Sequence, residues 1–271
     1  MAAFLQITSR FFDVLLAPFG HRAAAFDLVV WPIAMGFVAL LIVKAVSNQK
    51  AIASAKQQIG MRLLEIRLFQ HDIGQVMRST VAILWKNTLY VGNNVLPMLV
   101  MTGPMLVVLT QLVANYAYAP SPSGAVEVLR VELAPDVDPK TVALDLPPGV
   151  VLDAPPVRTA DSRVFWRLRS EVDGDHLLAI HVGSETLEKI WSVGGAPRKV
   201  PEKRLRGIEA FLYPGEAAIP RSSVVERIEI GTPRVRELRF FPDGEGGILG
   251  WFFVLSLVAG FALKDVVGVT L

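Results

Sequence analysis

The chain has 271 residues, of which 52% are hydrophobic and 19% charged, and its mean hydropathy is +0.44. This composition is too apolar for an average soluble domain and too charged for a chain made only of membrane spans, so the apolar residues must be concentrated in segments. The absence of cysteine excludes a disulfide framework, a cysteine zinc site and a thiol nucleophile, and a net charge of +2 is too small to indicate DNA binding.

Residues 1–25 are expected to form an amphipathic helix that lies in the membrane interface. Bulky apolar residues such as Phe11 and Leu15 surround a few charges there, including Arg10 and Asp13. This mixture is typical of helices that bury one face among lipid headgroups. The segment either only anchors the first membrane span or has a more specific role, and the sequence leaves both interpretations open.

Three stretches reach the roughly 20 apolar residues that a helix needs to cross a bilayer. They are residues 28–46, 95–118 and 247–271. The first stretch resembles a signal peptide because small residues that could form a cleavage site follow it. Its length and the cations at Lys44 and Lys50 argue against cleavage, so we expect a membrane anchor.

Residues 47–91 are expected to form a basic helical hairpin with coiled-coil character. The apolar residues recur at spacings of three and four, and the polar segment Gln70–Asp72 with Gly74 would form the turn. The apolar positions are Ile52, Ala55, Ile59, Leu63, Ile66, Ile73 and Val76 or Met77. Either the hairpin is a solvated linker without a partner, or it binds anionic lipid headgroups, ribosomal RNA or other membrane subunits.

The charges that flank the apolar stretches predict an orientation in the plasma (inner) membrane. Basic residues greatly outnumber acidic ones between positions 44 and 90, whereas the two kinds are nearly balanced over residues 119–246. The basic residues of the first segment are Lys44, Lys50, Lys56, Arg62, Arg67, Arg78 and Lys86, against Glu65 and Asp72. The positive-inside rule therefore places residues 47–91 in the cytoplasm, and the N-terminus and residues 119–246 outside, in the periplasm.

Residues 119–246 are expected to form an all-β domain, an immunoglobulin-like sandwich without its disulfide. Short runs of alternating polarity are separated by proline, glycine and aspartate turns. The expected strands are 126–133, 142–146, 164–168, 176–181, 188–193, 224–230 and 235–241, with a hairpin turn at Gly174–Asp175. His176 and His181 should lie on opposite faces of one strand and so cannot share a metal. The sequence contains no catalytic or cofactor-binding motif, so we predict neither an enzyme nor a metal site.

A few polar residues and prolines within the spans predict a hydrophilic groove. Lys44 either extends its ammonium group to the membrane surface or faces water between the helices. Prolines bend helices and free carbonyl groups, which then need partners or water. The candidate groove residues are Lys44, Asn93, Asn94, Pro97, Thr102, Pro104 and Gln111.

The order of these segments resembles the Oxa/YidC/Get superfamily of membrane insertases, in particular its reduced three-span branch. That branch includes archaeal YidC-like proteins and the insertase subunit of the ER membrane complex. Residues 11–16 are similar to the interfacial helix of the family, residues 41–44 to the end of its first core span, and residues 93–105 to its proline-bearing second core span. The β-domain departs from the family pattern because it lies between the second and third spans.

The resemblance implies a protein that helps client membrane proteins insert or fold through a hydrophilic groove, with Lys44 as the groove cation. The fold implied is an α-helical three-span membrane core with a cytoplasmic hairpin and an inserted extracytoplasmic β-domain. The partners implied are the lipid bilayer, client proteins and the ribosome or other membrane subunits at the hairpin, and no cofactor is expected. The alternative is a scaffold subunit of an envelope complex that has no insertase activity and whose β-domain binds a partner.

Overall fold

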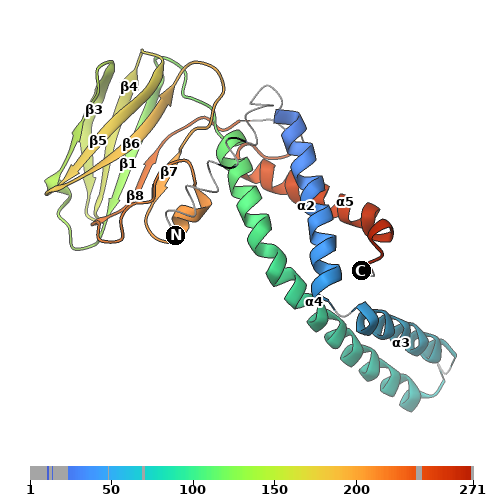
Figure 1. Cartoon of the computed structure of the whole chain (residues 1–271). Helices are drawn as coiled ribbons and strands as arrows, with labels where there is room; N and C mark the ends of the chain where they lie inside the picture. The colour runs from blue at the N-terminus through green and yellow to red at the C-terminus, as the bar shows by residue number, and fades with distance from the viewer. Residues whose placement is uncertain are drawn as a thin grey trace. The chain divides into compact units, whose positions relative to one another are not determined.

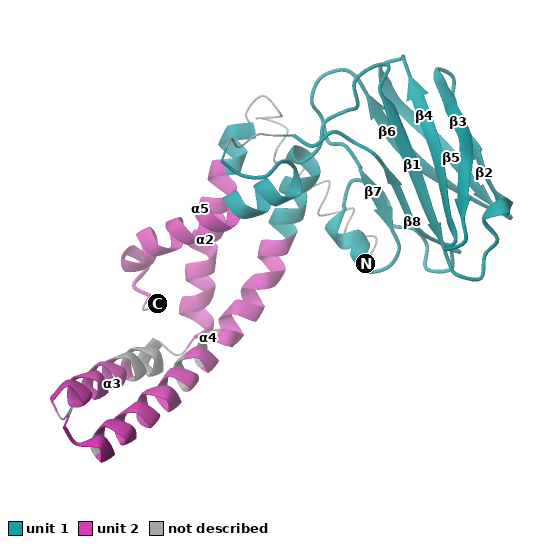
Figure 2. Ribbon diagram, turned by 180° about the vertical axis from the view of Figure 1, so that it is seen from behind, with its two compact units in different colours: residues 1–28, 107–251 teal, residues 29–106, 252–271 magenta. Residues whose placement is uncertain are grey.

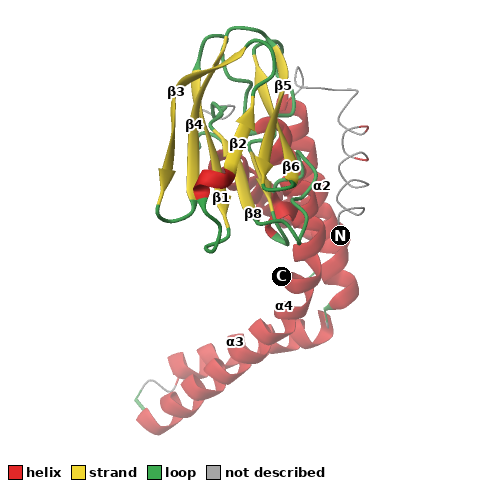
Figure 3. Ribbon diagram, turned by 90° about the vertical axis from the view of Figure 1, so that its left-hand side faces the viewer, coloured by secondary structure: helices red, strands yellow, loops and turns green. Residues whose placement is uncertain are grey.

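The computed structural model describes residues 11, 14, 24–47, 49–68, 71–235 and 240–269. Within them it has long helices and an antiparallel β-domain, coloured by type in Figure 3 and from end to end in Figure 1. The helices are α2 (Ala24–Val46), α3 (Gln49–Leu68), α4 (Ile73–Tyr116) and α5 (Glu245–Val267). Most of the interfacial helix predicted for residues 1–25 lies outside the described residues.

The chain divides into two units, which Figure 2 colours teal and magenta. The first unit comprises residues 1–28 and 107–251 and contains the β-domain. The second comprises residues 29–106 and 252–271 and contains most of α2, all of α3 and the greater part of α4 and α5.

Within the described part of the chain, three helical segments are long and apolar enough to cross a membrane, as the sequence predicts. They are Ala24–Val46, Val95–Tyr116 and Glu245–Val267, with mean hydropathies of 2.3, 1.8 and 2.0. The second segment is not a separate helix, because α4 runs without interruption from the hairpin to Tyr116 and includes Pro97 and Pro104. Proline is tolerated in such helices where neighbouring groups satisfy the carbonyl groups that it frees.

Helices α3 and α4 form the two arms of the hairpin in the second unit. The turn lies at His71–Asp72, within the segment predicted for it. The Ser79 hydroxyl of α4 is buried and donates to the Glu65 carboxylate of α3 at 2.9 Å. Hydrogen bonds from Arg62 and Ser79 lower the pKa of Glu65. The packed face is narrower than the predicted stripe, because Leu63 and Met77 are more than half exposed.

Helices α2 and α5 approach closely in the second unit because α2 has a glycine where they meet. A Cβ atom added to Gly36 would lie 2.5 Å from the Ser256 carbonyl oxygen and 3.0 Å from Cβ of Ala259. Packing of small residues is a main source of helix association in membranes, where lipid and helix surfaces are equally apolar. The helix ends are joined as well, since the Lys44 ammonium donates to the Val267 carbonyl oxygen at 2.6 Å.

We expect Gly36→Leu to separate α2 from α5, since overpacking of this kind costs about 1–3 kcal/mol. The melting temperature of the purified protein in detergent should fall by several degrees. Gly103→Ala is the matched control, because a Cβ atom at Gly103 meets nothing within 4 Å. If both variants melt like the natural protein, Gly36 does not set the spacing of these two helices.

The β-domain in the first unit has two antiparallel sheets. The larger sheet has the strand order β3-β4-β1-β8-β7, and the smaller has the order β2-β5-β6. The strand bounds are β1 Val126–Leu133, β2 Val142–Asp145, β3 Val150–Thr159, β4 Arg163–Ser170, β5 Gly174–Val182, β6 Glu185–Val193, β7 Lys203–Leu205 and β8 Val225–Ile230. Inward residues of both sheets, such as Leu129, Trp166, Leu178 and Trp191, form one buried core. The immunoglobulin-like topology stays a prediction.

Two strand predictions fail because glycine and proline motifs that are typical of turns lie within strands here. Gly174–Asp175 is not a hairpin turn, because Gly174 is the first residue of β5 and pairs with Val193 of β6. The chain crosses here from one sheet to the other. Strand β3 was missed because Pro155–Pro156 indicates a break, yet an edge strand with register shifts accommodates both prolines.

The strand predicted at 235–241 is not present in its described residues. Val235 and residues 240–241 lie outside strands, and residues 236–239 lie outside the described part. Strand β7, which has only three residues, was also missed. Arg234 instead forms an isolated antiparallel bridge with Tyr118, so the segments that enter and leave the β-domain lie side by side.

A buried lysine lies on the inward face of edge strand β6. Lys189 is fully buried and donates to Glu216 and to the Pro201 carbonyl oxygen, each at 2.5 Å. The other Glu216 oxygen accepts from the Ile190 backbone N–H at 2.7 Å. Burial lowers the pKa of Lys189, and the Glu216 carboxylate opposes that shift. Glu216 thus covers the strand edge and neutralises the buried cation.

Glu216→Ala should destabilise the β-domain by about 3–5 kcal/mol, because it leaves an uncompensated buried ammonium group. Glu226→Ala is the matched control. It removes the partner of Arg206 from a pair that is 31% and 44% exposed, so it should cost no more than about 1 kcal/mol. Pulse proteolysis of the full chain in detergent across a urea series measures both losses. Equal midpoints for the two variants would contradict the structural role of the buried pair.

Candidate functional site

An open groove of about 660 Å³ lies among α2, α4 and α5 within the second unit. All of its lining residues belong to the three candidate membrane spans. They are Met35, Gly36, Ala39, Leu40 and Val43 of α2, Met98, Met101, Thr102 and Met105 of α4, and Phe253, Ser256, Leu257, Gly260 and Phe261 of α5. This volume is within the range typical of ligand pockets, about 300–1,000 Å³.

The groove is apolar, whereas the sequence predicts a hydrophilic one. Its two hydroxyl groups bond to carbonyl oxygens of their own helices: Thr102 to Met98 at 2.8 Å and Ser256 to Phe253 at 3.1 Å. No charged side chain is among the described lining residues. Four of the seven methionines of the chain line the groove. Methionine is flexible and polarisable, so such a surface adapts to apolar ligands of different shapes.

The structure brings only one of the predicted groove residues into this groove. Thr102 lines it. Lys44 follows the lining residue Val43, but its ammonium group is bonded to Val267. Pro97 is buried and Pro104 is exposed, and neither is a lining residue.

The remaining predicted groove residues lie elsewhere or cannot be placed. Gln111 belongs to the first unit, where it is 2% exposed and its Oε1 atom has no hydrogen-bond partner. Asn93 and Asn94 belong to α4, but their side chains lie outside the described part. Polarity does not single out the four methionines, but three of them recur at spacings of three and four on α4.

In the first unit, hydrogen bonds join the ends of the three apolar helices. The Tyr116 hydroxyl of α4 donates to the buried Asp27 carboxylate of α2. The Trp251 indole N–H of α5 donates to the Leu28 carbonyl oxygen of α2 at 2.7 Å. Phe241 packs edge-on against Trp251, with ring centroids 5.9 Å apart. Each helix is therefore bonded to at least one other helix at this end.

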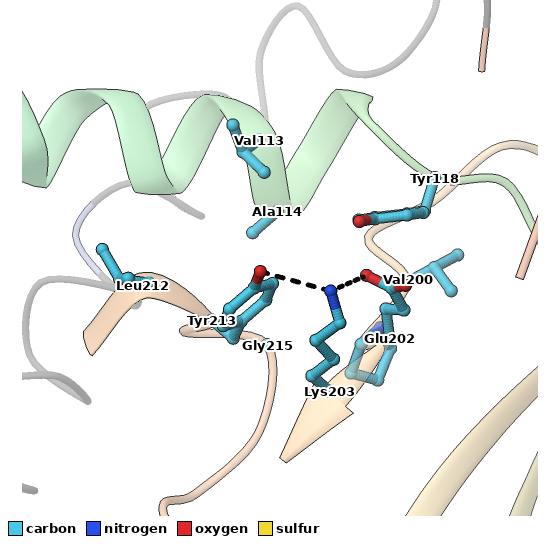
Figure 4. A pocket seen from close by; sticks show the side chains of 10 residues that line it. Val113, Ala114, Tyr118, Val200, Glu202, Lys203, Leu212, Tyr213 and Gly215 are labelled. Atoms are coloured by element: carbon cyan, nitrogen blue, oxygen red, sulfur yellow. Dashed lines mark hydrogen bonds and ion pairs between the residues drawn. The ribbon is translucent and has the colours of Figure 1, made fainter. Parts of the chain in front are cut away.

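A cluster of tyrosine, lysine and glutamate side chains, the junction cluster, connects the β-domain to these helix ends. The Tyr118 hydroxyl, just beyond α4, donates to Glu245 at the start of α5 at 2.5 Å. The Lys203 ammonium of β7 lies 3.3 Å from both the Tyr213 hydroxyl and the Glu202 carboxylate (Figure 4). The same figure shows Val113 and Ala114 of α4 beside these groups.

Burial and charge act together on the junction cluster. Burial raises the pKa of Tyr118, and hydrogen bonds to the carboxylates of Glu202 and Glu245 raise it further. Burial alone would lower the pKa of Lys203, but the Glu202 carboxylate, Tyr213 and Glu245 outweigh it, so this pKa is raised. The cluster therefore keeps its lysine charged and its tyrosine protonated at neutral pH.

The raised pKa of Lys203 predicts how its contribution to stability depends on pH. Lys203→Met should cost about 1.5–3 kcal/mol, as expected for the loss of a hydrogen-bonded charge. That contribution is fully present below the ordinary lysine pKa of 10.5 and is lost as the pH rises through the higher pKa of the folded state. Melting temperatures of both proteins between pH 7 and strongly alkaline pH measure the difference. Lys140→Met, at an exposed turn, is the control, and a difference that shrinks below pH 9 would contradict the assignment.

The two histidines of β5 lie on opposite faces of the strand, which confirms the sequence prediction. His176 is buried, 2.8 Å from the Val172 carbonyl oxygen and 3.0 Å from the Ser170 hydroxyl. His181 is on the outer face, 3.0 Å from Asp145. Ser170 is itself buried, so this serine and histidine pair belongs to the core of the domain. Among the described residues there is no group of three or more metal-ligating side chains.

Comparison of the chain with protein-family models, with curated proteins and with solved structures finds no match.

Proposed function

We propose that the chain is an integral membrane protein that helps apolar segments of client membrane proteins to enter the bilayer and fold there. The observation that supports this proposal is the open, methionine-lined groove among three helices of membrane-spanning length. An apolar helix that leaves water needs a surface that accepts many sequences. Flexible methionine side chains provide such a surface without selecting one shape.

The proposed mechanism is transfer between surfaces of similar polarity. The described lining residues present no charge and no free hydroxyl donor, so a client's apolar side chains lose nothing when they leave the groove for lipid. The helix ends in the first unit are hydrogen-bonded, so the spans do not need the client to hold them together. The groove therefore receives a client helix for a limited time, and hydrophobic burial in the bilayer completes its insertion.

The resemblance to the Oxa/YidC/Get superfamily supports the same function, as part of this proposal. In the proposed orientation, residues 47–91 are cytoplasmic and the β-domain is extracytoplasmic, because the basic residues concentrate in the hairpin. Lys44 has two further N–H donors besides the one bonded to Val267. We propose that Lys44 fixes the end of α5 near the cytoplasmic surface and offers these donors to acidic groups of a client that passes there.

Site-specific photo-crosslinking to stalled nascent membrane proteins tests the proposal. Probes that replace Thr102 and Leu257 should capture client chains, because both positions line the groove. A probe at Val258 is the matched control, since this neighbour of Leu257 is 57% exposed and is not a lining residue. Capture should be at least about tenfold stronger at the groove positions, equivalent to about 1.4 kcal/mol of preference.

The same experiment distinguishes the second candidate function, a scaffold subunit of an envelope complex. The junction cluster favours this alternative, because it joins the β-domain to helix ends through ion pairs and hydrogen bonds, as a partner-binding module would require. A scaffold predicts that the groove probes capture one constant partner, or only lipid, whichever client is stalled. That result would contradict the insertion proposal.

A further inference from the structure

The exposed face of α4 in the hairpin carries a regular apolar seam. From Met77 to Val95, positions that are apolar except for Thr88 alternate at spacings of four and three, which is the heptad pattern of a coiled coil. In heptad letters, the a positions are Val81, Thr88 and Val95, and the d positions are Met77, Leu84 and Val91. We call these six residues the α4 seam. Every one of them is exposed, including Leu84 at 62% and Val81 at 59%.

The hairpin itself does not use the α4 seam. Helix α3 runs alongside α4 in both views (Figures 1 and 3), and Ser79, which bonds to it, occupies an f position on the opposite side of α4 from the seam. Thr88 bonds its hydroxyl to the Leu84 carbonyl oxygen at 3.0 Å, so the seam presents no unpaired donor. Five of the six seam side chains are apolar, and an exposed apolar stripe of this length indicates a binding surface.

We propose that the α4 seam pairs with the α4 seam of a second copy of this chain, as a parallel two-stranded coiled coil. All three a positions have β-branched side chains, and two of the three d positions, Met77 and Leu84, are unbranched at Cβ. In parallel coiled coils, β-branched residues at a with unbranched residues at d favour two strands. Two copies that insert in the same orientation into one membrane present parallel α4 helices, so the membrane imposes the parallel geometry.

Charge allows the seam to pair with itself. In a parallel pair, each g residue faces the e residue of the following heptad in its partner, and these contacts decide which helices pair. Here they join Thr80 to Trp85, Asn87 to Gly92 and Ile73 to Arg78, so no two like charges meet. The other described cations of the hairpin, Arg62, Arg67 and Lys86, belong to α3 or to the f position of α4.

The geometry of the seam is less suited to a lipid surface. An interfacial helix presents a continuous broad apolar face, whereas this seam occupies two positions in seven. Its borders carry the exposed Ile73 and Trp85, but Arg78, Thr80 and Asn87 interrupt them. The six positions extend over roughly 27 Å at 1.5 Å per residue. A coiled coil of this length is marginal in water, but anchoring in one membrane raises the effective concentration of the partners.

The absence of cysteine from the chain makes disulfide crosslinking in native membranes a direct test. Single-cysteine variants Val81→Cys, Leu84→Cys and Val91→Cys of the full chain are oxidised and analysed without reductant. Each should give a homodimer in at least about tenfold excess over controls, because a disulfide requires Cβ atoms about 4 Å apart. Crosslinking of identical positions along the whole seam occurs only in a parallel, in-register pair. The controls are Ala82→Cys, at a b position, and Leu68→Cys on α3, which is 75% exposed.

A second variant places a charge in the seam at a position other than that of the cysteine, so its effect does not depend on how well two cysteines align. Leu84→Lys in the Val91→Cys background should abolish the homodimer, whereas Ala82→Lys should leave it unchanged. Maleimide labelling and resistance to alkaline extraction verify that each thiol is present and each protein is inserted. The proposal is overturned if inserted seam variants form no homodimer, if they crosslink to a different protein, or if the control positions dimerise equally well.

Discussion

Lipid is as apolar as the surfaces of membrane helices, so the hydrophobic effect gives such helices little reason to associate. The association of the three apolar helices here depends on a few polar and close-packed contacts. In the first unit these are the bonds of Asp27 with Tyr116 and of Trp251 with the Leu28 carbonyl oxygen. In the second unit they are the close approach at Gly36 and the bond from Lys44 to Val267. The groove lies beside the second of these contacts, since Gly36 and Ser256 are among its lining residues.

Polar groups that are shielded from water are hydrogen-bonded in different ways in the groove and in the β-domain. In the groove, each hydroxyl bonds to its own helix, so the surface is apolar although Thr102 and Ser256 contribute to it. In the β-domain, the buried Lys189 is retained because Glu216 and a backbone carbonyl surround its ammonium group. The first arrangement leaves a surface free for apolar ligands. The second stabilises a domain whose edge strand would otherwise expose unpaired backbone groups.

Elements with a strong local period were predictable from the sequence. The three spans and most strands followed from apolar length and from alternation, and β1 matches its prediction at both ends. Strand β3 and the crossing at Gly174 were not predictable, because proline and glycine occur at sheet edges as well as in turns. The inward position of Lys189 was not predictable either. Its partner Glu216 is distant in the sequence, and only the folded domain brings the two side chains together.

Of the predicted groove residues, only Thr102 lines the groove, and the lining is apolar where the sequence predicts a hydrophilic one. Lys44, Thr102 and Gln111 are all polar residues within apolar spans, yet they have three different environments. A polar side chain in a helix can bond to its own backbone or to a neighbouring helix end, and the sequence does not distinguish these outcomes. The methionines were the better signal, because their spacing on α4 places them on one face whatever the tertiary structure.

The bridge between Tyr118 and Arg234 brings the two ends of the β-domain together. The segments that enter and leave the β-domain lie side by side, and backbone bonds such as Ala119 N–H to the Pro233 carbonyl oxygen at 3.0 Å reinforce their pairing. A domain whose two ends are adjacent can be inserted into a connection without separating the elements on either side. The β-domain meets this condition, so it fits into the connection between the second and third spans without moving the segments around Tyr118 and Arg234 apart.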